Sequence, residues 1–267
     1  MPAPTVIAIS NQKGGEGKTT TAVNLAASIA AAEHRVLLID MDPQGNASSS
    51  VGYPNGVAEQ GTYDLLMGLA GPSEVVQSTE LPMLDVVPSS MDLAGAEVEL
   101  VEVERRESVL ARSLPALLEH REYEYVLLDC PPSLGLLTIN ALVASTSVLI
   151  PMQAKYFSLE GLGALNNTIE AVREAFNPGL SVEGIVFCMF DNRTNLARQV
   201  VQEVGEHFEG LVYDTRIPVN IRLSESPSHG KPALLYDIES KGAQAYLALA
   251  REVLARREGQ AEESTRP

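Results

Sequence analysis

The chain has 267 residues, of which 45% are hydrophobic and 20% charged, and its formal net charge at pH 7 is −16. Length and apolar content predict one large domain with a single substantial core, while the negative charge argues against a protein that coats nucleic acid over its whole surface, so any DNA contact must be local. No stretch approaches eighteen consecutive apolar residues and the N-terminus lacks the blocks of a signal peptide, so we expect a soluble, cytoplasmic protein.

Short, almost continuously apolar runs alternate along the chain with segments of helical spacing. Such runs are typical of strands covered on both faces, and the alternation predicts an α/β fold: a doubly wound, mostly parallel sheet flanked by helices. The expected strands are residues 5–10, 35–40, 84–89, 125–130, 147–152 and 182–189. The expected helices are residues 18–32, 105–120, 158–175, 194–208 and 240–257. Ligands of such sheets bind beyond the carboxyl ends of the strands, so polar clusters at these ends are candidate sites.

Two other polar segments are not predicted to form a ligand site. Residues 95–107, GAEVELVEVERRE, are acidic and predict a solvated helical face. Residues 259–267 are polar and predict a disordered tail, which leaves residues 1–258 as a single domain.

A glycine-rich segment, SNQKGGEGKTTT at residues 10–21, follows the first expected strand and opens the first expected helix. Successive backbone N–H groups in such a turn form an anion-binding nest, and the helix dipole adds positive potential at the same place. The glycines permit backbone angles and a close approach that a Cβ would obstruct. These glycines are Gly14, Gly15 and Gly17. Lys18 would reach the β- and γ-phosphates of a nucleotide, and the Thr19 hydroxyl would ligate Mg²⁺.

Acidic residues end the second and fourth of these strands. In DMDPQGN, residues 40–46, the chain is expected to turn at Pro43 and Gly45. One of Asp40 and Asp42 can hold a Mg²⁺-bound water while the other orients an attacking water. YVLLD ends in Asp129 as a Walker B strand does, and this carboxylate would accept a hydrogen bond from the water shell of the metal.

The motifs KGGEGKTT, DMDPQGN and LLDCPPSLGLLTINAL resemble the deviant Walker A, switch I and Walker B motifs of the ParA/Soj-like partition ATPases. These belong to the larger group that includes MinD and nitrogenase iron protein. Later blocks, FDNRTNLARQVVQEV, IPVNIRLSESPSHGKP and YDIESKGAQAYLALAREV, are similar to those of chromosomal-type ParA proteins, so the resemblance covers almost the whole chain. It implies a P-loop NTPase fold of the deviant Walker A type, without the N-terminal helix-turn-helix domain of longer plasmid-type relatives.

The resemblance implies roles residue by residue. Lys13 matches the signature lysine, which reaches across a nucleotide-sandwich dimer to the phosphates of the partner subunit. Asp42 matches the residue needed for hydrolysis, with Lys13 and Lys18 as the other catalytic residues, and Asp40 and Asp129 match the metal-shell carboxylates. The implied nucleotide contacts are Lys13, Gly14, Gly15, Glu16, Gly17, Lys18, Thr19, Thr20, Pro218 and Asn220. Pro218 and Asn220 would lie against the adenine, where Val219 replaces the usual arginine of the family, so one basic contact is expected to be missing.

Arg193 and Arg222 stand where relatives bind DNA without sequence preference. A guanidinium group suits this task because it remains charged and binds phosphate bidentately. The alternative is that both arginines form surface salt bridges with the abundant acidic residues. Arg198, Arg216 and Lys231 could enlarge the patch.

The implied function is a weak, Mg²⁺-dependent ATPase that forms an ATP-dependent homodimer, binds DNA on the nucleoid and is released when a ParB-like partner stimulates hydrolysis. It would serve chromosome or plasmid partition without a membrane.

A MinD-like ATPase is the first alternative, but it needs a terminal basic amphipathic helix, and the large residues of AYLALAREVLARREGQ stop at Leu254. A tyrosine autokinase shares the G-E-G-K loop, but its tyrosine cluster is missing from residue 247 onward. A nitrogenase-type reductase would need exposed cysteines to bind an iron-sulfur cluster. Cys130 and Cys188 lie in apolar runs and are expected to be buried thiols instead. A noncatalytic, nucleotide-dependent scaffold protein is a further alternative. It would keep the phosphate loop but would not need Asp42, so the presence of Asp42 argues against it.

Glu16 is the visible departure inside the loop, because the family more often has a small apolar residue there. A phosphate nest is built from backbone N–H groups, so the carboxylate is tolerated if it points away from the nucleotide. On this basis Glu16→Val should tighten ATP binding modestly, whereas weaker binding would mean that Glu16 makes a supporting contact.

Overall fold

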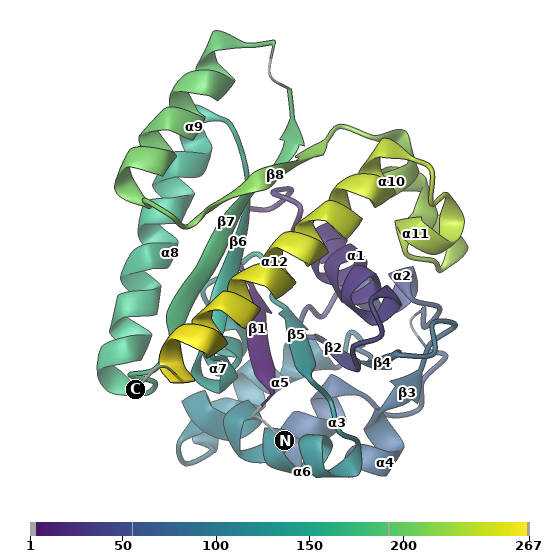
Figure 1. The fold of residues 1–267 in the computed structure, drawn as a ribbon. Helices are drawn as coiled ribbons and strands as arrows, with labels where there is room; N and C mark the ends of the chain where they lie inside the picture. Colours follow the sequence, from purple (N-terminus) through teal and green to yellow (C-terminus); the bar gives the residue numbers. More distant parts are fainter. Residues whose placement is uncertain (1–3, 55, 192, 266–267) are drawn as a thin grey trace.

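An eight-stranded sheet forms the centre of the fold (Figure 1) in the order β3-β4-β2-β5-β1-β6-β7-β8. The computed structural model describes residues 4–54, 56–191 and 193–265. All neighbouring strands in this part of the chain are parallel except β3 and β4, so the predicted doubly wound, mostly parallel sheet is confirmed. The strands are β1 Thr5–Ile9, β2 Val36–Asp40, β3 Gln77–Ser78, β4 Leu84–Val87, β5 Tyr125–Asp129, β6 Ser147–Gln153, β7 Ser181–Phe190 and β8 Val212–Pro218.

The six expected strands are all present, and two further strands are not in the sequence prediction. β8 is an edge strand whose sequence, VYDTRIP, mixes buried and exposed side chains and therefore lacks the continuous apolar character of the central strands. β3 has only two residues and pairs antiparallel with β4. Both lie at the margins of the sheet, where burial on two faces is not required.

Helices cover both faces of this sheet. The α-helices are α1 Lys18–Ala31, α2 Asn46–Ser50, α3 Thr62–Met67, α4 Pro72–Val75, α5 Leu93–Glu99, α6 Val109–His120, α7 Leu136–Ala144, α8 Tyr156–Ala175, α9 Asn195–His207, α10 Ile221–Glu225, α11 Ala233–Tyr236 and α12 Lys241–Thr265. The 3₁₀ turns are η1 Leu100–Glu102, η2 Arg106–Ser108 and η3 Ser226–His229. Within the described ranges, no helix combines the length and the apolarity that a membrane span requires.

Two expectations about helices need adjustment. The acidic segment is not one continuous helix, because η1 ends at Glu102 and η2 begins only at Arg106. Leu93, Ala96 and Leu100 are buried on one side of its first part, and Val98 is exposed on the other. α12 continues to Thr265, through most of the segment that we expected to be a polar tail, and its residues after Gly259 are mainly Gln, Ala and Glu, which are good helix formers. Residues 266–267 of that expected tail lie outside the described residues.

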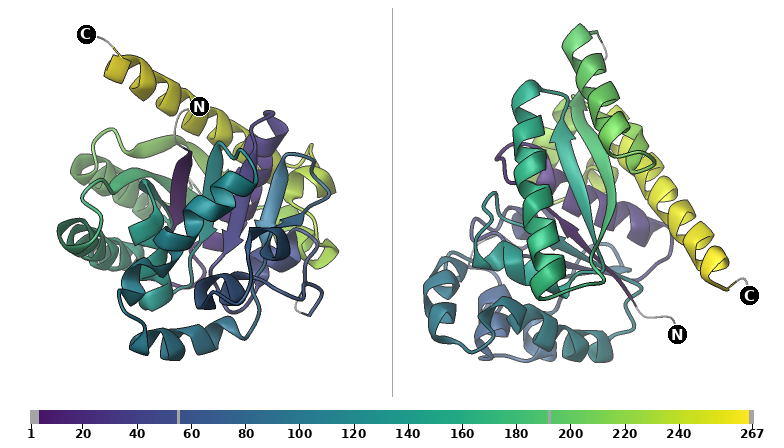
Figure 2. Two further views of the ribbon diagram at one scale, coloured as in Figure 1. Left: turned by 90° about the horizontal axis from the view of Figure 1, so that it is seen from below. Right: turned by 90° about the vertical axis from the view of Figure 1, so that its left-hand side faces the viewer.

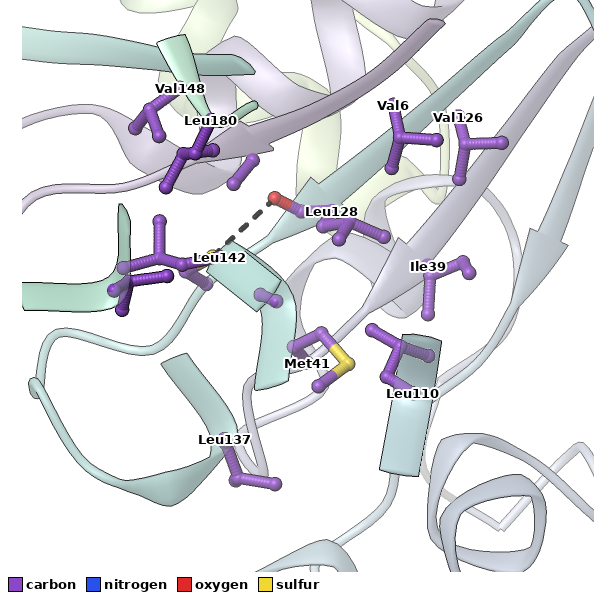
Figure 3. Close-up of a cluster of buried hydrophobic side chains, with 14 of the residues drawn as sticks. Val6, Ile39, Met41, Leu110, Val126, Leu128, Leu137, Leu142, Val148 and Leu180 are labelled. Atoms are coloured by element: carbon purple, nitrogen blue, oxygen red, sulfur yellow. Dashed lines mark hydrogen bonds between the residues drawn. The ribbon is translucent and has the colours of Figure 1, made fainter. Parts of the chain in front are cut away.

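Alternate side chains of each central strand enter two separate cores. On β1, Val6 and Ala8 face the core that packs against α6, α7, α8 and α9, while Ile7 and Ile9 face the core that packs against α1 and α12. Figure 2 shows α8 and α12 on opposite sides of the strands, and Figure 3 shows part of the first core around Leu128 and Leu142. Burial on both faces explains the unbroken apolar runs in the sequence.

The carboxyl ends of three central strands meet at one edge of the sheet. Ile9 at the end of β1 pairs with Asp129 of β5, and Asp129 pairs on its other side with Asp40 of β2. The segments that follow these strands therefore begin side by side. This register brings together the glycine-rich loop and both acidic clusters.

Candidate functional site

The glycine-rich loop ends directly in the first turn of α1. Gly15 and Gly17 have positive φ angles of 76° and 94°, and Gly17 is the N-cap of the helix. A Cβ on Gly17 would lie 3.2 Å from the Cβ and Sγ atoms of Cys188, so both its backbone angle and its surroundings favour glycine. No described side chain caps α1, and its first turn contains no acidic residue. Its N-terminal N–H groups are therefore suited to binding an anion.

Lys18 lies almost fully buried below this loop. Its Nζ atom donates a hydrogen bond to the carbonyl oxygen of Lys13 at 3.0 Å, which closes the loop around the lysine. Burial lowers the pKa of Lys18, and the carboxylates of Asp129 and Asp42 act in the opposite direction. A buried cation beside an uncapped helix N-terminus suits an anion such as a polyphosphate, and the neighbouring carboxylates suit a divalent cation bound with it.

Asp40 is held rigidly at the end of β2. Its Oδ2 atom accepts hydrogen bonds from the backbone N–H of Ser48 at 2.8 Å and from the Ser48 hydroxyl at 2.6 Å, and its Oδ1 atom accepts one from the N–H of Asp42 at 3.1 Å. Burial raises the pKa of Asp40 to about 6, against the effect of these hydrogen bonds. Asp42 in turn accepts a hydrogen bond from the N–H of Gln44, so the expected turn after Asp40 is present.

Asp129 is fully buried, and neither of its carboxylate oxygens has a hydrogen-bond partner of ordinary geometry among the described residues. Burial raises the pKa of this carboxyl well above its usual range, and the neighbouring Asp40 adds to the shift. The Thr19 hydroxyl opposes the shift from nearby. Buried polar atoms without partners require an explanation, and a hydrated divalent cation between Thr19 and Asp129 would satisfy them. The residues present therefore fit a Mg²⁺ site.

Glu16 does not extend into solvent, although it stands in the middle of the loop. It is 1% exposed. Its Oε2 atom accepts a hydrogen bond from the backbone N–H of Gln153 at 2.5 Å, and its Oε1 atom accepts one from the hydroxyl of Ser158 at 3.0 Å. The side chain of Gln153 also donates to the carbonyl oxygen of Gly15 at 2.8 Å. Both Glu16 oxygens are thus engaged by the junction of β6 and α8, and only the backbone of Glu16 is available to a phosphate.

Lys13 lies beside this junction and is partly exposed. Its Nζ atom is 3.9 Å from Oε1 of Glu16 and 5.6 Å from the ring centroid of Phe157. Its backbone N–H donates to the side-chain oxygen of Asn11 at 3.1 Å, and Asn11 donates to the carbonyl of Pro151. The charged end of Lys13 is therefore held by residues of its own chain.

A cavity of about 450 Å³ opens beside the first turn of α1. Thr19 and Thr20 line it from α1, Asn46 and Ser50 from α2, and Lys231 from the segment after η3. The cavity thus joins the first turn of α1 to α2, the helix that follows Asp40 and Asp42. Lys231 also forms an ion pair with Glu80 at 3.0 Å, so part of its charge is neutralised within the chain.

The segment expected at the adenine begins at the end of β8. Pro218 pairs with Phe190 of β7, and the side chain of Asn220 accepts a hydrogen bond from the N–H of Arg222 as the N-cap of α10. Val219, which replaces the usual arginine, is 71% exposed. A different arginine approaches this place, because Arg216 lies 5.1 Å above the ring centroid of Phe190. Sequence reasoning considered Arg216 only as an extension of a DNA-binding patch.

The two arginines expected to bind DNA each have acidic partners in this structure. Arg193 forms several hydrogen bonds with Asp191, yet its side chain is 84% exposed. Arg222 pairs with Glu225 at 2.8 Å and with Asp237 at 3.1 Å. The salt-bridge alternative is thus present at both positions. Exposed pairs of this kind contribute little to stability, so the pairing leaves both arginines able to exchange partners.

The structure brings six of the expected residues to one edge of the sheet. These are Lys13, Lys18, Thr19, Asp40, Asp42 and Asp129. Pro218 ends β8, and Arg193 and Arg222 follow β7 and β8, which are the last two strands at one margin of the same parallel sheet. Sequence reasoning missed Ser48, Gln153 and Ser158, which position the acidic residues. Only their three-dimensional contacts identify them.

The sequence and the fold of this chain are similar to those of known proteins. The family model for an AAA domain matches residues 4–182. Chromosome partitioning protein ParA of Myxococcus xanthus is 54% identical over 94% of this chain and 88% of that protein. Sporulation initiation inhibitor protein Soj of Bacillus subtilis is 53% identical over 94% of this chain and 98% of that protein. The crystal structure of cobyrinic acid a,c-diamide synthase from Mycobacterium smegmatis with bound ADP and magnesium matches with a TM-score of 0.82 and 34% identity, covering 96% of both chains. The chain belongs to the ParA/Soj family of partitioning ATPases.

Proposed function

We propose that the protein is a Mg²⁺-dependent ATPase with weak intrinsic activity that forms an ATP-bound dimer, binds DNA nonspecifically and drives chromosome or plasmid partition. The observation that carries this proposal is the pairing of Asp40 and Asp129 on adjacent strands beside a loop that holds Lys18. Membership of the ParA/Soj family supports the partition role. Residues 1–258 would form the ATPase domain.

The residues of the site have separate tasks in hydrolysis. Lys18 and the N–H groups of the loop would bind the phosphates. Thr19, Asp40 and Asp129 would hold Mg²⁺ and its water shell, and the ion would neutralise phosphate charge when bound. Asp42 would orient the attacking water, since phosphoryl transfer depends mainly on positioning and charge stabilisation.

The partition cycle would use hydrolysis as a switch. In an ATP-sandwich dimer, Lys13 of each subunit would help to neutralise the phosphates bound by the other. Loss of the γ-phosphate removes an anion that both lysines attract, so the interface weakens after hydrolysis. A ParB-like partner that accelerates hydrolysis would therefore release the protein from DNA.

DNA binding would depend on local charge. Arg193 and Arg222 would contact phosphates of the nucleoid, with Arg198 as a further candidate, because the net charge of −16 does not allow a general attraction to DNA. Dimerisation would double the number of these contacts and raise the affinity of the ATP-bound state.

Two structural observations favour this role over the alternatives. The apolar residues Tyr246, Leu249 and Val253 of α12 are buried in the core that contains α1. This face of the final helix is therefore not available to a membrane, whereas the MinD-like alternative requires a helix whose apolar face is exposed. Cys130 and Cys188 are also buried, which does not suit the exposed cluster ligands of a nitrogenase-type reductase.

Full-length protein should be tested for mass in solution and for DNA retention at low salt, with and without ATP and Mg²⁺. The expected result is a dimer that binds DNA only with ATP. Lys13→Ala should bind ATP and remain monomeric. A wild-type protein that neither dimerises nor binds DNA with ATP would refute the proposal.

A further inference from the structure

We propose that Glu16 is a positioning residue that restrains Lys13 on its own subunit, so that the phosphates of a partner subunit must compete with Glu16 for this lysine. The inference rests on the proposed function, because it assigns Lys13 to the partner's nucleotide. It adds a residue that sets how readily the ATP-bound dimer forms.

The first observation is the fixed position of the Glu16 carboxylate. It is buried, and both oxygens accept hydrogen bonds, from the N–H of Gln153 and from the hydroxyl of Ser158. It also lies at the N-terminus of the twenty-residue helix α8, where the helix dipole favours a negative charge. A carboxylate held in this way cannot follow Lys13 if the lysine moves away.

The second observation is the position of Lys13 relative to this fixed charge. Its Nζ atom lies 3.9 Å from Oε1 of Glu16 and 5.6 Å from the ring centroid of Phe157. A cavity of about 490 Å³ is lined by Lys13, Phe157 and Glu160, so the lysine has open space into which it can move. Lys13 is therefore attached to a fixed anion but free to leave it.

The movement of Lys13 away from Glu16 costs free energy. When Lys13 extends to a partner's phosphates, it gives up the attraction of Glu16, and Glu16 loses its nearby cation in a place with little solvent. Both effects disfavour the dimer. A partly exposed ion pair of this kind is weak, so we expect its removal to change the dimer dissociation constant by about threefold to tenfold.

The matched variant is Glu16→Gln. Its amide oxygen can still accept from the N–H of Gln153, and its amide nitrogen can donate to the Ser158 hydroxyl, so the loop stays attached while the negative charge is lost. Ser158→Ala makes the opposite change, because it removes one hydrogen bond and keeps the charge. Glu160→Gln removes a charge from the same cavity at a residue that forms no ion pair with Lys13 among the described residues.

The dimer dissociation constant should be measured by analytical ultracentrifugation with Mg²⁺ and a saturating non-hydrolysable ATP analogue, so that differences in nucleotide affinity do not contribute. We expect Glu16→Gln to dimerise about threefold to tenfold more tightly than wild type at low salt, with a smaller gain at high salt. Ser158→Ala and Glu160→Gln should show no such gain. Thermal melting of each variant verifies that it is folded.

Two outcomes overturn the inference while leaving the proposed function intact. In the first, wild type dimerises and a folded Glu16→Gln variant dimerises no more tightly. In the second, Glu160→Gln gives the same gain, which would mean that general charge rather than the pairing is responsible. If neither wild type nor any variant dimerises, the proposed function fails, and this inference fails with it.

Discussion

Asp40 and Asp129 are paired residues on neighbouring parallel strands, and both carboxyl groups are fully buried at the same edge of the sheet. Only Asp40 is satisfied by neighbouring donors, through Ser48 and Asp42. Asp129 has no comparable partner among the described residues. One member of the pair is thus fixed by the protein, while the other is left to a ligand that neutralises it.

Asp129→Asn is expected to stabilise the nucleotide-free protein and to impair hydrolysis. The buried carboxylate disfavours the folded state without a cation, so its replacement by a neutral amide should raise the free energy of unfolding by about 1–3 kcal/mol at pH 8. Denaturant unfolding measures this gain, and phosphate release with Mg²⁺ and ATP measures the loss of activity. Asp214→Asn, a change at an exposed carboxylate, should alter neither quantity.

The stability gain of Asp129→Asn should depend on pH with a definite sign. Burial raises the pKa of Asp129 in the folded state above its unfolded value, so the folded wild type retains a proton that the unfolded chain has lost. The associated stability is fully present below the unfolded pKa, about 4, and is lost as the pH rises through the folded pKa. The advantage of the variant should therefore grow between pH 5 and pH 8. A constant difference would contradict the raised pKa.

Glu16→Val is expected to weaken ATP binding, contrary to the expectation from the sequence alone. Valine cannot accept the hydrogen bonds from Gln153 and Ser158, so the loop loses its attachment to the junction of β6 and α8. The lost hydrogen bonds should lower the free energy of unfolding by about 1–3 kcal/mol, and the looser loop should bind ATP several-fold more weakly. A fluorescent ATP analogue and denaturant unfolding measure the two effects.

The control for Glu16→Val is Glu174→Val, which changes an exposed glutamate on α8 in the same way. It should alter neither stability nor ATP affinity by a measurable amount. Tighter ATP binding by Glu16→Val would restore the interpretation from the sequence, in which the carboxylate only repels the phosphates.

The central strands and the acidic residues that end them were predictable because two-sided burial leaves a continuous apolar run. Val36–Asp40 and Tyr125–Asp129 show this plainly, and the parallel sheet then brings Asp40 and Asp129 to the same edge. β8 was not predictable in this way, since an edge strand with one partly exposed face carries no such run. α7, LLTINALVA, was also missed, because it is apolar on nearly every side and has no clear helical period.

The surroundings of Glu16 could not have been predicted from the sequence. Its hydrogen-bond partners lie 137 and 142 residues away along the chain, and they meet it only because β6 lies beside β1 in the sheet. Neither a backbone N–H nor a serine hydroxyl has a recognisable sequence pattern for such a contact. The loop motif itself therefore indicated the chemistry, but not how the carboxylate is accommodated.

Asp42→Ala is expected to bind ATP but to hydrolyse it at least 100-fold more slowly, because the variant lacks the carboxylate that would orient the water. The ATP-bound dimer should accumulate, since the γ-phosphate that both Lys13 residues attract is not removed. Phosphate release and light scattering after size-exclusion chromatography measure the two effects. Glu59→Ala, at an exposed glutamate in the loop before α3, should behave as wild type. Normal turnover by the Asp42→Ala variant would remove Asp42 from its proposed role.

Arg222→Glu is expected to abolish DNA retention of the ATP-bound protein at low salt while leaving ATP binding within about twofold of wild type. The reversed charge repels phosphate, and the acidic partners Glu225 and Asp237 then add to the repulsion instead of pairing with a cation. A filter-binding or gel-shift assay over a series of salt concentrations measures the loss, and the wild-type affinity should fall steeply with salt. Arg251→Glu makes the same charge change at an exposed position of α12 and should retain DNA binding. If both variants lose DNA equally, the net charge of the protein controls retention; if neither does, Arg222 does not contact DNA.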